Sequence, residues 1–301
     1  MTSPTSAAEP YIPRRARPET ARKVLLYGVY LVVAAIFLTP FVWTVVTSFK
    51  TLNDSLNFNL IPHPWTTAAW TDLWTNPSYH FPTYIKNSLF LAAVIVTCNL
   101  FLSALGGYAF ARLKFPGREV LFMLVLGTLM IPDQLRLVPI YLMLVNWIPG
   151  WVGHLGWHGA SFVNRNGVIL INLVSATSLF LMRQYFLTIP RDLEEAAKLD
   201  AAGYFKTYRK VMLPLAGPAL AAVGILTFQG TWNGLFWSAV LLQDSSQYTI
   251  PIGLANFHFA YQTLWPPLMA ASVLAILPIL AIFIVFQRYF VAGVAAAGVK
   301  G

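Results

Sequence analysis

The sequence predicts an all-α integral membrane protein with six transmembrane helices. Hydrophobic residues make up 57% of its 301 residues and charged residues only 10%, whereas about a quarter of the residues in a soluble domain are charged. Several apolar runs also reach the roughly 20 residues that a helix needs to cross about 30 Å of hydrocarbon. Runs of this length without alternating polarity are helices, because lipid cannot hydrogen-bond the open edge of a strand.

The apolar runs define the predicted spans, which cover residues 24–46, 88–111, 120–145, 168–187, 218–242 and 268–290. The first span follows basic residues, as the core of a secretory signal does. Its apolar run is much longer than the roughly 7–15 residues of such a core, and no small-residue cleavage site follows it. We therefore expect it to stay in the mature protein. The preceding residues 1–22 lack apolar periodicity, which predicts a disordered tail and leaves residues 23–301 as one transmembrane domain.

Basic residues gather on one side of this topology. Of the 20 Lys and Arg, 16 lie in, or in the span ends next to, the segments before the first span, between the second and third, between the fourth and fifth, and after the sixth. The positive-inside rule makes this side, with both termini, cytoplasmic. The formal charge of +9 therefore reflects topology. Without an aromatic-rich basic module, the sequence predicts no nucleic-acid binding.

The two longer external connections predict neither a catalytic nor a metal site. Residues 50–84 and 146–166 contain prolines and tryptophans, which favour short caps at the membrane–water boundary. His154 and His158 are spaced i,i+4, but no Cys, Asp or Glu lies nearby and glycines interrupt the segment. A zinc site therefore lacks its ligands. The single cysteine, Cys98, falls inside the second span, where we expect it to serve packing.

Two pairs of polar residues at membrane depth need partners. Asp133 and Arg136 lie at i,i+3 spacing in the third span, so they can pair on one helix face. Gln229 and Asn233 share a face of the fifth span at i,i+4, with Trp232 beside them. The sequence leaves two interpretations of each pair open. The charged residues neutralise each other or line a solute pathway, and the amides bind neighbouring helices or line a route for a hydroxyl-rich solute.

A charged segment, residues 188–214, separates the fourth and fifth spans on the cytoplasmic side. Helical spacing places Leu193, Ala196 and Ala197 toward one face, while Glu194 pairs with Lys198 on the water side. Two short amphipathic helices presented to water are suited to binding a soluble partner. The alternative is a helix with an ordinary solvated face.

This charged segment resembles the cytoplasmic coupling loop of importer permeases of the ATP-binding-cassette (ABC) class. The coupling-loop residues that the resemblance implies are Glu195, Ala196, Ala197, Asp200, Ala201, Gly203, Leu213 and Pro214. Other motifs are similar to the membrane subunits of carbohydrate importers of the maltose type, and they are Asn87-Ser88-Leu89, Gly107-Tyr108-Ala109-Phe110-Ala111-Arg112, Phe115-Pro116-Gly117, Leu181-Met182-Arg183-Gln184-Tyr185-Phe186, Trp232-Asn233 with Trp237, and the tail from Gln287. The resemblance covers residues 23–301 and is to the smaller, six-helix partner of a heterodimeric pair.

The resemblance implies a type I ABC importer permease fold with a cytoplasmic coupling helix pair, in a bacterial or archaeal cytoplasmic membrane. It implies a second permease subunit, two ATP-hydrolysing subunits, an external solute-binding protein and contact with membrane lipid. The chain itself would bind no cofactor and catalyse no reaction, because ATP and Mg²⁺ would sit on the ATPase subunits. In agreement, the sequence has no Walker A motif.

The implied cargo is a sugar, an oligosaccharide or a related polyol. Its pathway would be lined by Gln229, Asn233, Asp133 and Arg136, with Trp232 as an apolar surface for a sugar ring. Two other classes stay open: an ATP-independent channel or secondary transporter, and a membrane scaffold without transport. Co-purification with a soluble ATPase separates the importer from both.

The sequence departs from the family pattern at one turn. The family usually has glycine after the coupling-loop aspartate, but Ala201 follows Asp200 here and the next glycine is Gly203. Because a left-handed turn costs alanine about 1 kcal/mol or more, we expect the bend between the two short helices to shift toward Gly203.

Overall fold

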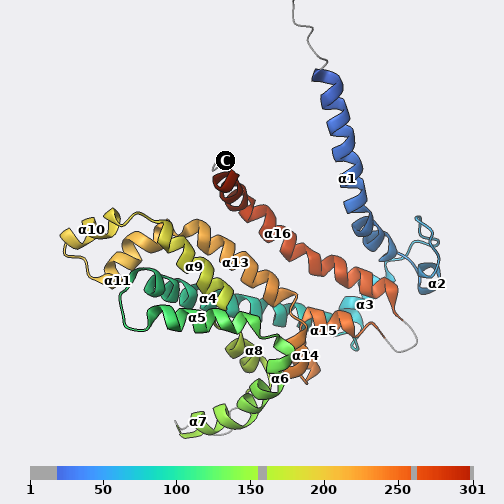
Figure 1. Ribbon diagram of the computed structural model, residues 1–301. Coiled ribbons are helices and arrows are strands. Elements are labelled where there is room, and N and C mark those ends of the chain that lie inside the picture. Colours follow the sequence, from blue (N-terminus) through green and yellow to red (C-terminus); the bar gives the residue numbers. More distant parts are fainter. Residues whose placement is uncertain (1–18, 155–160, 259–262, 299–301) are drawn as a thin grey trace, which may run out of the picture.

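The structure is a computed structural model that describes residues 19–154, 161–258 and 263–298. In these ranges the chain consists of helices joined by turns and loops, with an isolated bridge between His258 and Thr263 (Figure 1). Four helical segments, residues 22–47, 81–112, 165–188 and 265–287, are long and apolar enough to cross a membrane. Two bent helix pairs bring the total to six if each pair counts as one span. The predicted all-α membrane fold is confirmed. His158, one of the two histidines weighed as metal ligands, lies outside the described residues.

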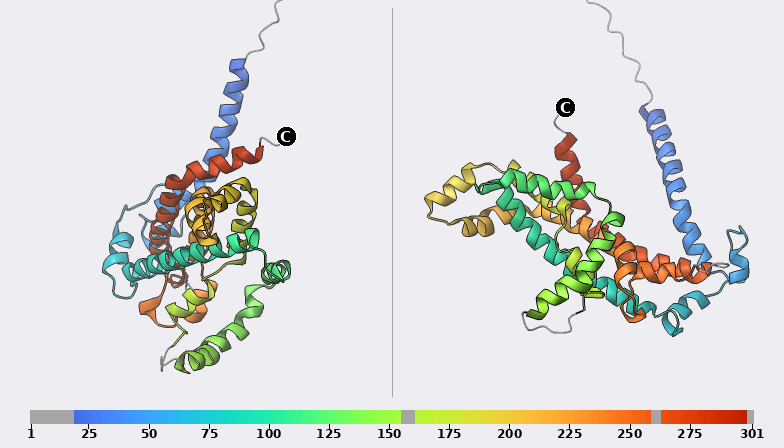
Figure 2. Two further views of the ribbon diagram at one scale, coloured as in Figure 1. Left: turned by 90° about the vertical axis from the view of Figure 1, so that its left-hand side faces the viewer. Right: turned by 60° about the horizontal axis from the view of Figure 1, so that its bottom comes forward.

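Three of the spans are single long helices. These are α1 (Glu19–Thr47), α4 (Phe81–Arg112) and α16 (Trp265–Gly298). The apolar stretch of α1 is not buried by the rest of the chain. Figures 1 and 2 show that α1 extends away from the other helices along most of its length. A helix that is apolar around its whole circumference lies in lipid or against another subunit.

The third span is broken, which corrects the expectation of one continuous helix over residues 120–145. It consists of α5 (Arg118–Gly127), the short 3-10 turn η1 (Thr128–Met130), α6 (Asp133–Leu142), the π-helical η2 (Met143–Trp147) and α7 (Ile148–His154). The two halves are bent by 107°. The break falls at Ile131-Pro132, because proline lacks a donor N–H and disfavours helix in the residue before it.

The fourth and fifth spans are interrupted as well. Helices α8 (Arg165–Ile171) and α9 (Ala176–Thr188) are separated by residues 172–175. In the fifth span α13 (Gly217–Trp232) ends ten residues before the predicted end of the span at 242, and α14 (Phe236–Leu241) follows after a turn. The sequence prediction of one helix over 218–242 is therefore wrong, since the chain has two glycines close to this turn, Gly230 and Gly234, and glycine weakens a helix.

The core forms around α4, which packs against α9 and α13, and Figure 1 shows the three helices side by side. Gly107 permits the closest approach, because a Cβ there would stand 2.6 Å from the Met182 Cβ and 2.9 Å from the Arg183 backbone nitrogen. Tyr108, Met182 and Phe186 are buried in the cluster that surrounds this contact. The close packing of α4 against α9 thus rests on a residue without a side chain.

The cap that joins α1 to α4 is held by a buried lysine. Lys50, only 1% exposed, follows α1 and donates from Nζ to the Asn59 carbonyl at 2.5 Å and the Asn57 carbonyl at 3.3 Å. Its ammonium also lies 4.7 Å from the ring centroid of Trp43. The cap contains two short helices, α2 (Leu52–Ser55) and α3 (Ala68–Thr75). On the same side of the chain, η4 (Ser245–Gln247) and α15 (Ile250–Ala255) follow α14.

Candidate functional site

The charged segment between the fourth and fifth spans forms a pair of short helices far from the cap that joins α1 to α4 (Figure 1). They are α10 (Asp192–Leu199) and α11 (Tyr204–Thr207), and the π-helical η3 (Tyr208–Met212) and α12 (Leu213–Leu215) lead on to α13. Acidic residues occupy the first turn of α10 and Lys198 its last turn, which complements the helix dipole. We call residues 188–214 the coupling loop.

The bend of the coupling loop lies at Ala201, not at Gly203. Ala201 has φ +53°, and two hydrogen bonds close a Schellman motif: the Ala202 N–H donates to the Ala197 carbonyl and the Ala201 N–H to the Lys198 carbonyl, each at 3.0 Å. Gly203 is extended, with φ −69° and ψ 166°. The expected shift toward Gly203 is therefore wrong, because the two hydrogen bonds hold alanine in a left-handed conformation.

The outward face of α10 differs in one residue from the sequence prediction. Ala196 is exposed, but Ala197 is only 8% exposed and lies on the inner side of the helix. Leu193 is exposed as predicted, and the outward stripe continues through Leu199, which is 90% exposed. The spacing of 193, 196 and 199 is the signal that would have added Leu199 to this stripe. It continues into the side chains of Tyr204 and Phe205 on α11, which are 66% and 68% exposed.

A buried arginine joins the coupling loop to the spans. Arg112, the last residue of α4, pairs its Nε with Glu194 Oε1 at 3.5 Å, and the two side chains are 4% and 14% exposed. The same guanidinium donates to the carbonyls of Phe186 (3.0 Å from Nε) and Ile189 at the end of α9. Glu194 therefore faces inward instead of pairing with Lys198 on the water side as the sequence suggested. Arg112 connects α4, α9 and α10 at one point.

A second arginine braces α9 beside this point. Arg183 pairs with Glu119 of α5 at 3.0 Å and donates to the Phe110 carbonyl of α4 at 3.3 Å. Its guanidinium also lies 4.1 Å from the ring centroid of Phe122. The ends of α4, α5 and α9 that lie near the coupling loop are thus tied together by charge-assisted contacts.

The Leu213-Pro214 motif closes the coupling loop where the chain re-enters the core. Leu213 packs on the cluster that contains Met212 and Ala216, and Pro214 occupies the first turn of α12, where proline is tolerated. The chain then bends by 76° between residues 204–215 and 217–232. The motif therefore sets the angle between the coupling loop and α13.

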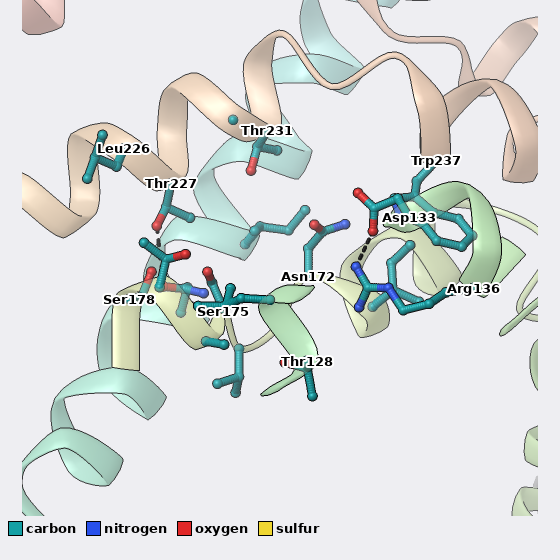
Figure 3. Close-up of a pocket in the computed structure, with 18 of the residues that line it drawn as sticks. Thr128, Asp133, Arg136, Asn172, Ser175, Ser178, Leu226, Thr227, Thr231 and Trp237 are labelled. Atoms are coloured by element: carbon teal, nitrogen blue, oxygen red, sulfur yellow. Dashed lines mark hydrogen bonds and ion pairs between the residues drawn. The ribbon is translucent and has the colours of Figure 1, made fainter. Parts of the chain in front are cut away.

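A polar cavity of about 640 Å³ lies at membrane depth within the chain. Figure 3 shows Thr227 and Ser178 toward one end, the Asp133–Arg136 ion pair at the other and Asn172 between them. Asp133 and Arg136, predicted as pathway residues, are brought together here as predicted. The cavity also has lining residues that the sequence analysis missed, among them Asn99, Thr128, Asn172, Ser175, Ser178, Thr227 and Thr231. The i,i+4 pair Thr227 and Thr231 was the signal that could have found it.

The other predicted pathway residues lie outside this cavity. Gln229 and Asn233 are exposed on α13 and at its C-cap and do not line the cavity. Trp232 is only 2% exposed, donates from Nε1 to the Ala275 carbonyl at 2.9 Å and stacks on Phe228. The expectation that Trp232 offers a face to a sugar ring is wrong, because its ring is used in packing α13 against α16.

Comparison with known proteins places the chain in a transport family. Residues 101–296 match the family described as "Binding-protein-dependent transport system inner membrane component". The chain is 32% identical to "Trehalose/maltose transport system permease protein MalG" of Thermococcus litoralis, over 95% of this chain and 99% of that protein. It is 31% identical to "Arabinooligosaccharides transport system permease protein AraQ" of Bacillus subtilis, over 93% and 96% of the two chains.

A solved structure shares the fold. A chain of a bacterial ABC transporter "involved in the import of the acidic polysaccharide alginate" superposes with a TM-score of 0.75 at 23% identity, covering 93% of this chain and 100% of that one. With the family match, the helical spans and the coupling loop, the chain belongs to the binding-protein-dependent transport family and is an inner-membrane permease component of an ABC importer.

Proposed function

We propose that this chain is one of two permease subunits of an ATP-driven importer that carries a sugar, an oligosaccharide or a related polyol into the cytoplasm. The names of its relatives support the cargo class, since they refer to trehalose or maltose and to arabinooligosaccharides. The polar cavity supports it as well, because its side chains offer both donors and acceptors for hydroxyl groups.

The observation that carries this proposal is the attachment of the coupling loop through Arg112. Closure of an ATPase subunit against α10 and α11 would push on Glu194, which Arg112 connects to the ends of α4 and α9. Both helices line the cavity. A small displacement of the loop is thereby converted into a rearrangement of the spans, because packed elements move as rigid bodies.

The proposed assembly contains a second permease subunit, two ATP-hydrolysing subunits that bind ATP and Mg²⁺, and an external solute-binding protein. The exposed length of α1 and the exposed amides of Gln229 and Asn233 offer surface to the second permease or to lipid. The exposed residues Leu193, Glu195, Ala196, Leu199 and Asp200 offer surface to an ATPase subunit. A related solved transporter was captured with an "alginate pentasaccharide-bound periplasmic protein".

The proposed orientation has both termini in the cytoplasm of a bacterium or archaeon. It rests on the 16 basic residues that the topology gathers on one side. In this arrangement residues 1–22 are a cytoplasmic tail, residues 23–301 form the permease domain, and the coupling loop lies on the same side as the ATPase subunits.

Reconstitution with the products of neighbouring genes tests the proposed function. We expect the chain to co-purify with a soluble ATPase and a second permease, and vesicles containing the complex to accumulate saccharide only with ATP on the ATPase side. Accumulation driven by a sodium or proton gradient without ATP would favour the secondary transporter. An intact complex that moves no solute would favour the scaffold.

A further inference from the structure

Three helix breaks converge on the polar cavity. Its lining includes Pro132 at the break of the third span, Asn172 and Ser175 at the break of the fourth, and Thr231, one residue before the last residue of α13. Interrupted backbone at membrane depth is tolerated where it lines a cavity, because the freed N–H and C=O groups can then form hydrogen bonds with polar groups there. Three interruptions around one space indicate that the cavity is a built feature of the fold.

The cavity is polar but carries no net charge. Of its 22 lining residues only Asp133 and Arg136 are ionisable, and these two form an ion pair. Eight further lining residues carry uncharged hydroxyl or amide groups. A charged ligand would need an unbalanced countercharge at this depth, whereas a neutral ligand rich in hydroxyls finds acceptors and donors without one.

Two buried polar atoms of the lining lack partners among the described residues. Asn99 is 1% exposed, and its Oδ1 accepts from Ser103 and Thr227, each at 3.3 Å, while its Nδ2 has no hydrogen-bond partner there. The buried Arg136 Nε has none either. Each unsatisfied buried group costs about 1–3 kcal/mol, so both atoms are donors that a ligand in the cavity can satisfy.

We propose that this cavity is a binding site for an uncharged saccharide on its way through the membrane. Asn99, Asn172 and Arg136 donate to sugar hydroxyls, Asp133 accepts from them, and Trp237, which Figure 3 shows beside the ion pair, contributes an apolar wall. The inference rests on the proposed function and narrows its cargo to neutral saccharides. The volume of about 640 Å³ lies within the roughly 300–1,000 Å³ of small-molecule sites.

A second cavity among the spans is apolar, in contrast to the polar cavity. It measures about 510 Å³ between α4, α13 and α16, and it is lined almost wholly by apolar side chains such as Val96, Leu220 and Phe228. Hydroxyl groups there would lose their hydrogen bonds to water without replacement, at a cost of about 1–3 kcal/mol each. A saccharide therefore belongs in the polar cavity and not in the apolar one.

Thiol protection tests the site directly, because Cys98 is the single cysteine and does not line the cavity. In a Cys98→Ser background, Thr231→Cys and Thr128→Cys place probes in the cavity, and Asn233→Cys places a control on exposed surface outside it. The assembled importer is labelled with a small thiol reagent, without ATP, in the presence of maltotriose, arabinotriose or trigalacturonic acid.

We expect at least one neutral saccharide to slow labelling at both cavity positions about tenfold, which corresponds to about 1.4 kcal/mol, and to leave the control unchanged. Unchanged labelling with both neutral saccharides, or equal protection by trigalacturonic acid, would overturn the proposal. ATP-driven uptake by the same preparation is measured separately. ATP-driven uptake without protection from labelling refutes the binding site and leaves the proposed function intact. Protection from labelling together with uptake that does not depend on ATP supports the binding site and refutes the proposed function.

The charged pair supplies a second test that does not depend on labelling. Asp133→Asn leaves a net positive cavity and Arg136→Gln a net negative one, whereas the double variant is neutral again. We expect each single variant to lower uptake of the neutral saccharide about tenfold and the double variant to recover part of the loss. Single variants with wild-type uptake, or a double variant whose loss is the sum of the two, would contradict a role for charge balance.

Discussion

Arg112 and Glu194 form an ion pair between the last residue of one transmembrane helix and the first turn of the coupling helix. The pair spans 3.5 Å and is almost wholly buried. Because Arg112 also donates to two carbonyls at the end of α9, it ties the coupling loop to both α4 and α9. We propose that movement of the loop is passed to the spans through this connection.

Removing the charge of Glu194 should loosen this connection. We expect Glu194→Gln to retain the ATPase subunit and to lower the amount of saccharide moved per ATP, because the buried ion pair with Arg112 loses one of its two charges. Asp192→Asn, a similar change at an exposed position of the same turn, is the control. Equal transport per ATP in the two variants would show that the ion pair does not transmit movement.

The exposed stripe of α10 should bind the ATPase subunit. Leu199→Asp puts a charge into the 90% exposed apolar position, and we expect it to reduce co-purification of the ATPase about tenfold or more, since a charge at an apolar interface must be desolvated. Lys198→Asp places the same side chain one residue away, outside the stripe. The assignment fails if both variants retain the ATPase equally. Ala197→Trp should instead disorder the loop, because Ala197 is buried.

The turn at Ala201 should tolerate glycine better than alanine. With φ +53° at Ala201, we expect Ala201→Gly to stabilise the loop by about 0.5–1 kcal/mol. Gly203→Ala should be close to neutral, because Gly203 has a negative φ and an added Cβ would meet nothing within 4 Å. Thermal unfolding of the purified complex measures both variants. A destabilised Ala201→Gly variant alongside a stabilised Gly203→Ala variant would place the left-handed residue elsewhere.

The close contact of α4 and α9 should fail when Gly107 gains a side chain. In Gly107→Ala the new methyl group would meet the Arg183 backbone at 2.9 Å, so we expect a lower melting temperature and a lower yield of assembled complex. Gly127→Ala is the matched control, since nothing lies within 4 Å of its Cβ position. Equal melting temperatures for the two variants would mean that the helices are farther apart than described.

The membrane orientation can be read from two single-cysteine variants. In a Cys98→Ser background, Ser161→Cys should react with an impermeant thiol reagent added outside intact cells, and Lys206→Cys only after the membrane is opened. Both positions are exposed, whereas the neighbouring Thr207 is 4% exposed and unsuitable as a probe. The reverse labelling pattern would place both termini outside.

The fold class and the coupling loop could be predicted from sequence because they depend on local patterns. Apolar runs give spans, and the motif around Glu195 gives the loop. The pathway was predicted less well. Tryptophan is a residue type that stacks on sugar rings, which is why Trp232 was predicted to line the pathway. Trp232 is instead buried against Phe228 and Ala275, and only the packed structure shows the contact with Ala275. Polar groups on α4 and on the three interrupted spans likewise form a cavity only through tertiary packing.

The account's central claim is that ATP hydrolysis on a partner drives transport through the coupling loop. Uptake of radiolabelled saccharide into proteoliposomes that contain the complete importer tests it most directly, with wild-type chain compared with the Glu195→Lys variant. Glu195 is exposed on α10, so the change leaves the fold intact. The account predicts ATP-dependent uptake by the wild type, and for the variant normal insertion, loss of uptake and a weakened ATPase contact. Wild-type uptake by the variant, or equal uptake with and without ATP, would contradict it.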